Sequence, residues 1–446
     1  MKFKYFVISI PLLVVAASSA CAQNLAFINS FPGDSAIGPK TNPDNVGAVG
    51  PEHVVDFTCA DFVVHDKKTG KTLLKKTQTE FWKDAGIPDV LKPNDPRFLY
   101  DPLSGRYFAT IAHDRVHKLY LAVSSSSDPT KPWKGVLLPC SSPDFGFRIG
   151  VDKNGFYGCY WNYNKDTHTM MDCIVIPKAD LLVPEGPDLS NLKIFSGIEI
   201  ESFPATDLDP NKSAEAPEIL LNREFGNSFG KLNMYKVTWS GKAPSISKLQ
   251  SIPLSRTYVS PNGSSLKNQA TQPAPGGKLR ADEGRRTCAV YAAGGSIFSC
   301  NEAKRDIDSR CGIFWCEVKA SNGILLQEGF IDSPDCDYLA PSLAVDAKGN
   351  AGIGCTRSSS SEFPSACVMA RKAGDPKNSM GKPVIAAKGT TVFTSKSAGK
   401  YGIPWGNYNS TCLDPVDPTI IWSYQEYAAS FTPDQFSTFW TAFRVK

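Results

Sequence analysis

The sequence predicts an all-β fold. One short pattern recurs five times: apolar residues, an Asp, two or three turn residues, a Gly or Pro, and apolar residues again. Each copy is typical of a strand that enters a tight turn and leaves as the next strand, because Asp can bond its own downstream backbone and Gly supplies a positive φ. Helical periodicity is nearly absent. The Asp residues of the five copies are Asp66, Asp101, Asp152, Asp346 and Asp414. A strand-turn-strand unit that recurs along a chain indicates a β-propeller, and these Asp residues are predicted to be turn formers.

The spacing of the turns indicates the size of one blade. Asp101 and Asp152 are 51 residues apart, and the 194 residues from Asp152 to Asp346 correspond to nearly four such units. At about 50 to 60 residues a blade, the chain gives seven blades, with six as the alternative. We expect a single propeller domain over residues 23–446, because no stretch resembles a linker between domains.

Some elements can be placed individually. The strand near Ala48–Val55 is expected to pair with strands of the C-terminal segment, which would close the ring and remove exposed sheet edges. Thr79–Ala85 and Lys178–Leu182 indicate short helical turns. Asn233–Trp239 and Gly312–Val318 have strand composition, and we expect them to be outer strands of blades whose Asp turns have eroded.

The N-terminus predicts secretion. Lys2 and Lys4 precede an apolar run, and Ala20-Cys21-Ala22 fits the small-residue rule for signal peptidase, so residues 1–22 are predicted to be a signal peptide. In the alternative, a lipoprotein, Cys21 is acylated, but Ser18 stands where a large aliphatic residue is expected. No later stretch is long and apolar enough to span a membrane. We therefore expect an extracellular or periplasmic protein.

The cysteines agree with an oxidising compartment. The chain has 13 Cys, and 12 remain after the predicted signal peptide is removed. Facing positions on hairpins favour three disulfides, Cys159–Cys173, Cys288–Cys300 and Cys355–Cys367, although other strand pairings would give these residues distant partners. The sequence has no Cys-x-x-Cys pair, and we expect no metal and no cofactor.

The charge balance excludes two classes of partner. Without Lys2 and Lys4 the chain has 46 basic and 44 acidic residues, so the whole molecule has no electrostatic preference for nucleic acid or for an anionic membrane. We expect a monomer. Asn211, Asn262 and Asn409 begin glycosylation sequons, which would make the chain a glycoprotein in a eukaryotic source.

One motif carries a family resemblance. The segment Ser126–Trp133 resembles a degenerate Asp-box, the hairpin of sialidase-like propellers: Ser126, Asp128 and Trp133 match, while Thr130 and Pro132 depart from the pattern. More broadly, the chain resembles secreted bacterial propellers of unassigned activity. That group tends to show Arg-Trp-Gly-Asp-Tyr where this chain has Pro404–Tyr408, so two charges are missing here. The resemblance implies a propeller fold and not catalysis, because the Asp-box is a structural turn.

Several charged residues are candidates for a functional site. Arg97, Arg148, Arg223 and Arg286 are candidate ligand-binding residues, because an Arg fork grips a carboxylate in bidentate fashion. Glu224 and Asp282 are the candidate catalytic carboxylates, since glycoside hydrolysis needs two carboxylates that converge. For all of these residues the alternative is a structural ion pair at a blade edge.

An aromatic cluster is a further candidate. Tyr160 and Trp161 lie among other Tyr and Asn residues, a composition that suits stacking and hydrogen bonding to a sugar ring. In the alternative, these rings fill the space between blades. The sequence thus favours extracellular recognition of a glycan or a cell-surface partner through the top face of a propeller. The alternative is a glycoside hydrolase or other polysaccharide-cleaving enzyme with carboxylates at the ring centre, and whether the chain is an enzyme stays open.

Overall fold

The computed structural model is nearly all β-structure. It describes residues 24–35, 44–90, 94–113, 118–140, 147–162, 170–199, 202–261, 269–281, 289–395, 402–429 and 437–446. The predicted signal peptide lies outside these ranges. No helix within them is long and apolar enough to cross a membrane.

The first three groups of strands follow one another along the chain, each antiparallel and in sequential order. The first group is β2 (Val46–Val49), β3 (His53–Phe57), β4 (Asp61–Asp66) and β5 (Thr72–Thr77). The second is β6 (Asn94–Asp101), β7 (Arg106–His113), β8 (Lys118–Ser124) and β9 (Trp133–Leu138). The third is β10 (Arg148–Val151), β11 (Gly155–Trp161), β12 (Met170–Pro177) and β13 (Lys193–Glu199).

The fourth and fifth groups join the third in one larger sheet, because β15 (Thr206–Asp207) pairs with both β10 and β22 and one bridge links β19 to β23. The fourth group is β14 (Phe203–Pro204), β16 (Glu218–Arg223), β17 (Ser228–Ser240) and β19 (Gln250–Val259), with β18 (Ala243–Ile246) beside β17. The fifth is β22 (Ala289–Ala293), β23 (Ser296–Lys304), β24 (Cys311–Lys319) and β25 (Leu325–Ile331).

The last two groups complete the described strands. The sixth is β26 (Asp337–Val345), β27 (Ala351–Ser359), β28 (Glu362–Arg371) and β29 (Val384–Ala387). The seventh is β30 (Ser410–Leu413), β31 (Ile420–Tyr427), β32 (Ser437–Val445) and β1 (Leu25–Ser35). A small hairpin of β20 (Ala270–Thr271) and β21 (Lys278–Leu279) stands apart.

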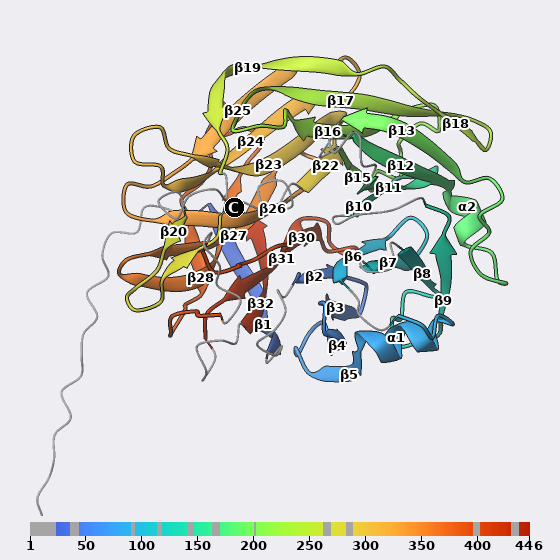
Figure 1. Cartoon of the computed structure of the whole chain (residues 1–446), viewed down its shortest axis with the longest axis horizontal. Coiled ribbons are helices and arrows are strands. Elements are labelled where there is room, and N and C mark those ends of the chain that lie inside the picture. The colour runs from blue at the N-terminus through green and yellow to red at the C-terminus, as the bar shows by residue number, and fades with distance from the viewer. Residues whose placement is uncertain are drawn as a thin grey trace, which may run out of the picture.

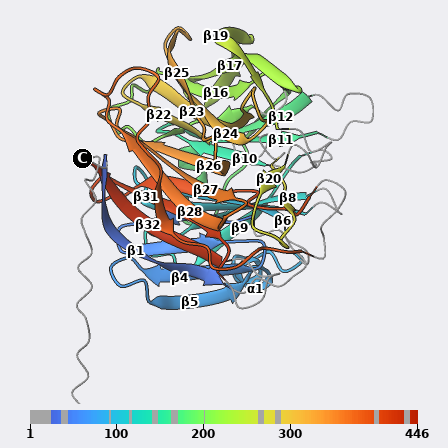
Figure 2. The same cartoon turned by 90° about the vertical axis from the view of Figure 1, so that its left-hand side faces the viewer.

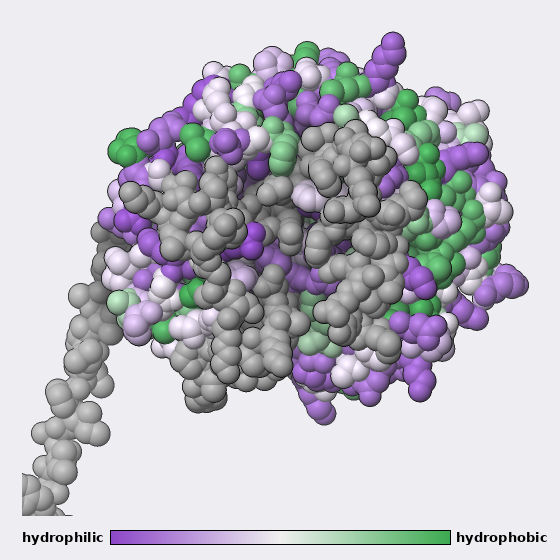
Figure 3. All heavy atoms as spheres, viewed as in Figure 1, coloured by the Kyte–Doolittle hydropathy of each residue, from purple (hydrophilic) through white to green (hydrophobic). Residues whose placement is uncertain are grey.

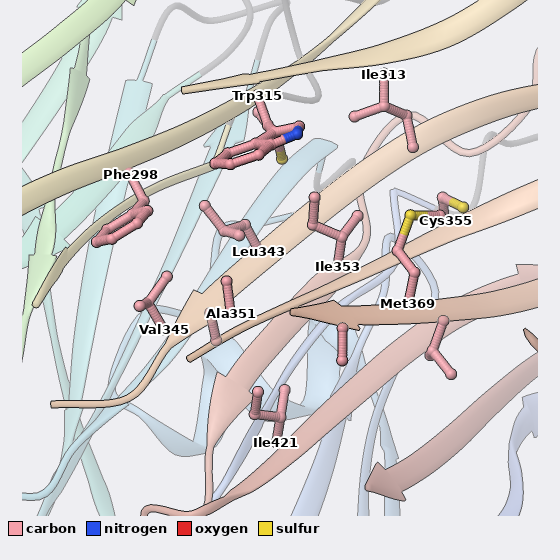
Figure 4. Close-up of a cluster of buried hydrophobic side chains, with 14 of the residues drawn as sticks. Phe298, Ile313, Trp315, Leu343, Val345, Ala351, Ile353, Cys355, Met369 and Ile421 are labelled. Atoms are coloured by element: carbon pink, nitrogen blue, oxygen red, sulfur yellow. The ribbon is translucent and has the colours of Figure 1, made fainter. Parts of the chain in front are cut away.

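The groups surround a common centre (Figure 1). Their first strands contact one another in the order β2, β6, β10, β14, β22, β26 and β30, and β30 contacts β2 again. This closed ring of antiparallel sheets is a β-propeller, as the Asp-turn repeat predicts. Hydrophobic side chains fill the space between neighbouring sheets: Figure 4 shows Phe298, Trp315, Leu343, Ile353 and Ile421, which come from three successive groups, in one buried cluster.

Ring closure differs from the prediction. Ala48 pairs with Val55 within the hairpin of β2 and β3, because Gly50 and Pro51 form a turn in the middle of the predicted strand. The N-terminal strand β1 closes the ring instead, as the fourth strand of the seventh group, antiparallel to β32 (Figure 2). The predicted outer strands Asn233–Trp239 and Gly312–Val318 lie in β17 and β24, each of which has a partner on both sides, so neither is an edge strand.

Both predicted helical turns are present. α1 (Gln78–Asp84) begins with a capping box, in which Thr77 and Glu80 satisfy each other's backbone N–H groups. α2 (Lys178–Leu181) is a single turn after β12.

The Asp residues of the repeated pattern close turns, as predicted. In each turn the Asp Oδ1 accepts a backbone N–H two or three residues further on. The bonds run from Thr69 to Asp66 at 2.8 Å, from Leu103 to Asp101 at 3.0 Å, from Asn154 to Asp152 at 2.8 Å, from Lys348 to Asp346 at 2.8 Å and from Val416 to Asp414 at 2.9 Å. Asp128 of the Asp-box-like segment closes the turn between β8 and β9 in the same way. The structure thus assigns these acids a role in the turns.

Three of these Asp residues also tie neighbouring groups together, which the sequence did not reveal. Their carboxylates accept from a Lys Nζ of the next group in the ring. The ion pairs are Lys178–Asp101 at 2.8 Å, Lys212–Asp152 at 2.9 Å and Lys67–Asp414 at 3.2 Å. These three Asp residues therefore act both within their own turns and between blades.

Two of the three predicted disulfides, Cys159–Cys173 and Cys355–Cys367, are not formed in the structure. Cys159 lies directly opposite Cys173, and Cys355 lies directly opposite Cys367, so the hairpin pairing behind the prediction is present. These four cysteines are nevertheless free thiols, and burial raises the pKa of Cys159 and of Cys355 well above the usual range. Cys300 is opposite Ala289 and Trp315, and Cys288 lies outside the described residues.

Candidate functional site

The inner strands enclose a cavity of about 770 Å³ at the centre of the ring, which we call the central cavity. Most of its wall is apolar and comes from β2, β6, β22, β26 and β30. Its apolar lining includes Val46, Leu99, Phe203, Val290 and Leu343. Cavities of this size hold small organic ligands, which makes the ring centre the candidate site.

Arg97 and Tyr408 are polar residues of the cavity lining, which also includes Asp209 and Asp414. The Arg97 guanidinium carbon lies 3.3 Å from the centroid of the Tyr408 ring, so the two planes stack. The Arg97 Nε donates to the Phe147 carbonyl at 2.6 Å, and the Tyr408 hydroxyl donates a very short hydrogen bond to Asp95 Oδ1. All three polar side chains are buried, so the array is rigid.

Arg148 is the second guanidinium of this lining. It begins β10, is 2 % exposed, and its guanidinium carbon lies 4.9 Å from the centroid of the Phe203 ring. Burial, the largest cause, and the charge of Arg148 lower the pKa of Arg97, while Tyr408 and Asp95 raise it. Arg97 and Arg148 thus lie close enough for each charge to act on the other, and we call them the guanidinium pair.

The loop that carries Tyr408 is held by hydrogen bonds to its neighbours. Asn407 Nδ2 donates to Asp44 Oδ1 at 2.6 Å, and the Gly406 N–H donates to Glu426 Oε2 at 2.7 Å. Burial raises the pKa of Glu426 well above its usual range. Asn407 stands where the Arg-Trp-Gly-Asp-Tyr pattern has an Asp. Its uncharged amide donates to the Asp44 carboxylate, whereas an Asp at this position would bring a second negative charge.

Asn409 belongs to the same network. Its Nδ2 donates to the Ala340 carbonyl at 2.8 Å, and its Oδ1 accepts from Asn45 at 2.7 Å. This amide is engaged on both sides in the folded chain. Of the other predicted acceptors, Asn211 is exposed at the cavity lining and Asn262 lies outside the described residues.

The structure brings two of the predicted ligand-binding arginines together and leaves others elsewhere. Arg97 and Arg148 line the central cavity, whereas Arg223 does not: it donates to Ser260 Oγ at 2.8 Å and stacks on Phe229. Glu224 is partly exposed and pairs with Lys231 at 3.2 Å, also away from the cavity, as the ion-pair alternative describes. Asp282 and Arg286 lie outside the described residues.

The aromatic candidates lie in the blades. Tyr160 is fully buried in a hydrophobic cluster, and its hydroxyl donates to Asp172 Oδ2 at 3.0 Å. Trp161 is partly buried against another cluster, and neither side chain lines the central cavity. Their positions agree with the alternative that these rings fill space between blades.

Tyr408 is the site residue that sequence reasoning did not select. It lies far from Arg97 in sequence, and only the closed ring brings the two together. Its one sequence signal is the Trp-Gly-Asn-Tyr motif that carries part of the family resemblance.

Comparisons with known proteins give only remote similarity. No protein-family model and no curated protein matches the chain. Among solved structures, Hsv2 of Kluyveromyces lactis has 9 % identity and a TM-score of 0.40, covering 86 % of this chain and 94 % of that chain. The GH93 α-L-arabinofuranosidase of Fusarium graminearum in complex with arabinobiose has 10 % identity and a TM-score of 0.41, covering 79 % and 93 %. The polysaccharide lyase Uly1 has 9 % identity and a TM-score of 0.38, covering 77 % and 88 %. Similarity at this level supports no conclusion about activity.

Proposed function

We propose that the chain is a secreted, seven-bladed propeller that recognises a glycan, free or on a cell-surface partner, in its central cavity. The observation that carries this proposal is the cavity itself, a space of about 770 Å³ with mostly apolar walls, into which the lining residues Arg97 and Tyr408 bring a fixed polar cluster held by Asp95. A few fixed polar groups in an apolar pocket are typical of small-ligand sites. The ring of contacts among the first strands supports seven blades, and the N-terminal sequence pattern supports secretion.

Binding can be tested by closing the cavity. The purified protein is titrated with a panel of neutral and acidic mono- and disaccharides by calorimetry. Ala347 is exposed and lines the cavity, so Ala347→Trp should obstruct it and weaken binding at least about tenfold. The matched control is Ala373→Trp, an exposed position between β28 and β29 of the same blade and outside the cavity lining. Binding that survives Ala347→Trp would place the ligand elsewhere.

One observation favours the enzymatic alternative, a glycan-cleaving activity at the same place. The Tyr408 hydroxyl donates to Asp95, and the guanidinium groups of Arg97 and Arg148 lie nearby. A carboxylate that can accept the proton of a hydroxyl acts as a general base and makes that hydroxyl a candidate nucleophile. Chromogenic glycosides and polysaccharides would reveal product release. Release that is lost in Tyr408→Phe supports this reading. Loss in Glu224→Gln or Asp282→Asn, with Tyr408→Phe active, would favour the carboxylates predicted from the sequence.

A further inference from the structure

The two ends of the central cavity differ in how far the lining is exposed. At the end where the inner strands begin, the lining residues Arg97, Arg148 and Tyr408 are buried. At the opposite end, every exposed residue of the described lining lies beyond the end of an inner strand. These residues, which we call the turn mouth, are Asp209, Pro210, Asn211, Gly294, Ala347 and Pro418. Among the described residues, the cavity is therefore exposed at the turns that follow the inner strands.

Tyr291 lies in the buried wall of the same cavity. It is the middle residue of β22, opposite Thr206 of β15, and it is 4 % exposed. Its hydroxyl makes no hydrogen bond to another described residue. A buried hydroxyl without a partner costs free energy, and such groups are rare in folded proteins. The unpaired hydroxyl therefore points to a partner that occupies the cavity.

The hydroxyl of Tyr291 stays protonated at neutral pH. Burial, the largest cause, raises the pKa of Tyr291, and Cys412 and Asp207 raise it further. Cys412 also lines the cavity, but it belongs to β30, and β26 lies between β22 and β30 in the ring. The phenol and the thiol therefore act on each other across the cavity. Because burial also raises the pKa of Cys412 to about 12, both groups are uncharged and can donate a hydrogen bond.

The charged side chains of the lining balance one another. Arg97 and Arg148 are basic, Asp209 and Asp414 are acidic, and no other described residue of the lining carries a charge. Asp414 is also paired with Lys67 at 3.2 Å. A cavity with this balance and mostly apolar walls suits a ligand that has hydroxyl groups and no net charge.

We propose that Tyr291 is a ligand-binding residue of the central cavity and that its hydroxyl donates a hydrogen bond to an oxygen of a neutral saccharide. The inference deepens the proposed function and rests on it, because it names a binding residue and a saccharide class for the same cavity. A hydroxyl oxygen of the sugar supplies the acceptor that Tyr291 lacks within the described residues. The turn mouth gives the saccharide access to the cavity.

The test removes the same atom from two tyrosines. Tyr291→Phe removes the hydroxyl in the cavity wall. Tyr107→Phe is the matched control, because the Tyr107 hydroxyl is also buried and makes no hydrogen bond to another described residue, yet Tyr107 does not line the cavity. Urea unfolding measures the stability of each free protein. Calorimetry measures the affinity of each protein for cellobiose, lactose and maltose as neutral saccharides and for digalacturonate as an acidic one.

We expect both Phe variants to unfold at a urea concentration at least as high as the wild type, because neither hydroxyl has a hydrogen bond to lose. The wild type should bind a neutral disaccharide, and Tyr291→Phe should weaken that binding about fivefold while Tyr107→Phe leaves it unchanged. Unchanged binding in Tyr291→Phe, or binding of digalacturonate alone, would overturn the inference and leave the proposed function standing. A lower unfolding midpoint for Tyr291→Phe alone would also overturn it, because the hydroxyl would then have a partner in the free protein. Binding of no saccharide would overturn the inference and count against the proposed function.

Discussion

Asn407 shows how one amide positions the Tyr408 loop. Its Nδ2 donates to the buried Asp44 carboxylate, whose other oxygen accepts from the Cys59 thiol at 2.8 Å. Burial raises the pKa of Cys59 well above its usual range, and the charge of Asp44 raises it further. The thiol therefore stays protonated and acts as a donor, so Asp44 has two neutral donors and no room for a second negative charge.

Asn407→Asp is expected to destabilise the protein by about 2–3 kcal/mol at pH 7, because two buried carboxylates would face each other without a proton between them. The penalty should shrink on going to pH 5, since one protonated carboxyl can donate as the amide does. Urea unfolding at the two pH values measures both effects. Asn322→Asp, at an exposed turn, is the control and should stay within about 0.5 kcal/mol of the wild type. An equal penalty for both variants would argue against the Asp44 contact.

Individual residues of the site differ in how far they could be predicted from the sequence. Arg97 and Arg148 are recognisable as candidates because Arg is uncommon near the start of a buried strand. The pairing of Tyr408 with Asp95 was not predictable, because it depends on how the last strands return to the first. Glu224 also has an Arg beside its carboxylate in the sequence, yet it pairs with Lys231 away from the cavity.

At the scale of single elements, Lys212 links the turn after β10, which contains Asp152, to the next group of strands. Its Nζ lies 2.9 Å from Asp152, 2.9 Å from Asp207 and 3.1 Å from Glu218. Burial raises the pKa of Glu218 well above its usual range although Lys212 acts to lower it. One ammonium group thus compensates several buried carboxylates from the third and fourth groups of strands.

Lys212→Met is therefore expected to cost about 3–5 kcal/mol, since it leaves these carboxylates without a cation. Lys76→Met is the matched control: Lys76 pairs with Asp84 at 2.7 Å, and both side chains are partly exposed, so its loss should cost less than about 1 kcal/mol. Denaturant unfolding of the two variants gives the comparison. Similar losses for both would mean that Lys212 does not link the blades.

At the scale of elements, the sequence pattern was sufficient to predict the turns and the hairpin register. The Asp turns follow from local backbone chemistry, and they were predicted correctly for all five Asp residues of the repeated pattern. The facing cysteines also follow from hairpin register. Ring closure does not, because the alternation in Leu25–Ser35 is weak and its partner β32 lies at the other end of the chain.

Surface composition varies between elements. Several exposed apolar side chains lie on the edge strands of the second and third groups and after α2, including Leu137, Val183 and Ile194. Figure 3 shows hydrophobic residues gathered on the right-hand side of the molecule, where these elements lie. Charged and polar residues dominate most of the remaining described surface in this view.

At the scale of the whole molecule, a buried polar cluster joins the first and last groups of strands where the ring closes. Asp34 at the end of β1 pairs with Lys75 of β5 at 2.7 Å, and the Asp34 N–H donates to Asp56 Oδ2 at 2.6 Å. Asp56 also accepts from Trp440 of β32 at 2.5 Å and contacts His65 Nε2 at 3.1 Å. The cluster therefore links β1 and β32 to the first blade, and its charges should make ring closure sensitive to pH.

Asp34 provides the test of that sensitivity. Burial, with smaller contributions from Asp56 and Asp61, raises the pKa of Asp34 from 3.8 to about 6, although Lys75 acts to lower it. A carboxyl whose pKa is higher in the folded state favours folding while protonated, so its contribution is lost as the pH rises from about 4 through 6. The free energy of unfolding of the wild type relative to Asp34→Asn should thus fall by on the order of 3 kcal/mol between pH 4 and pH 7. Guanidinium unfolding across this range measures the difference.

Asp66→Asn should shift in the opposite direction, because hydrogen bonds from Thr69 lower the pKa of Asp66 and its contribution is lost as the pH falls. A flat difference for Asp34→Asn would show that the closure cluster does not hold its carboxyl in the buried state described here.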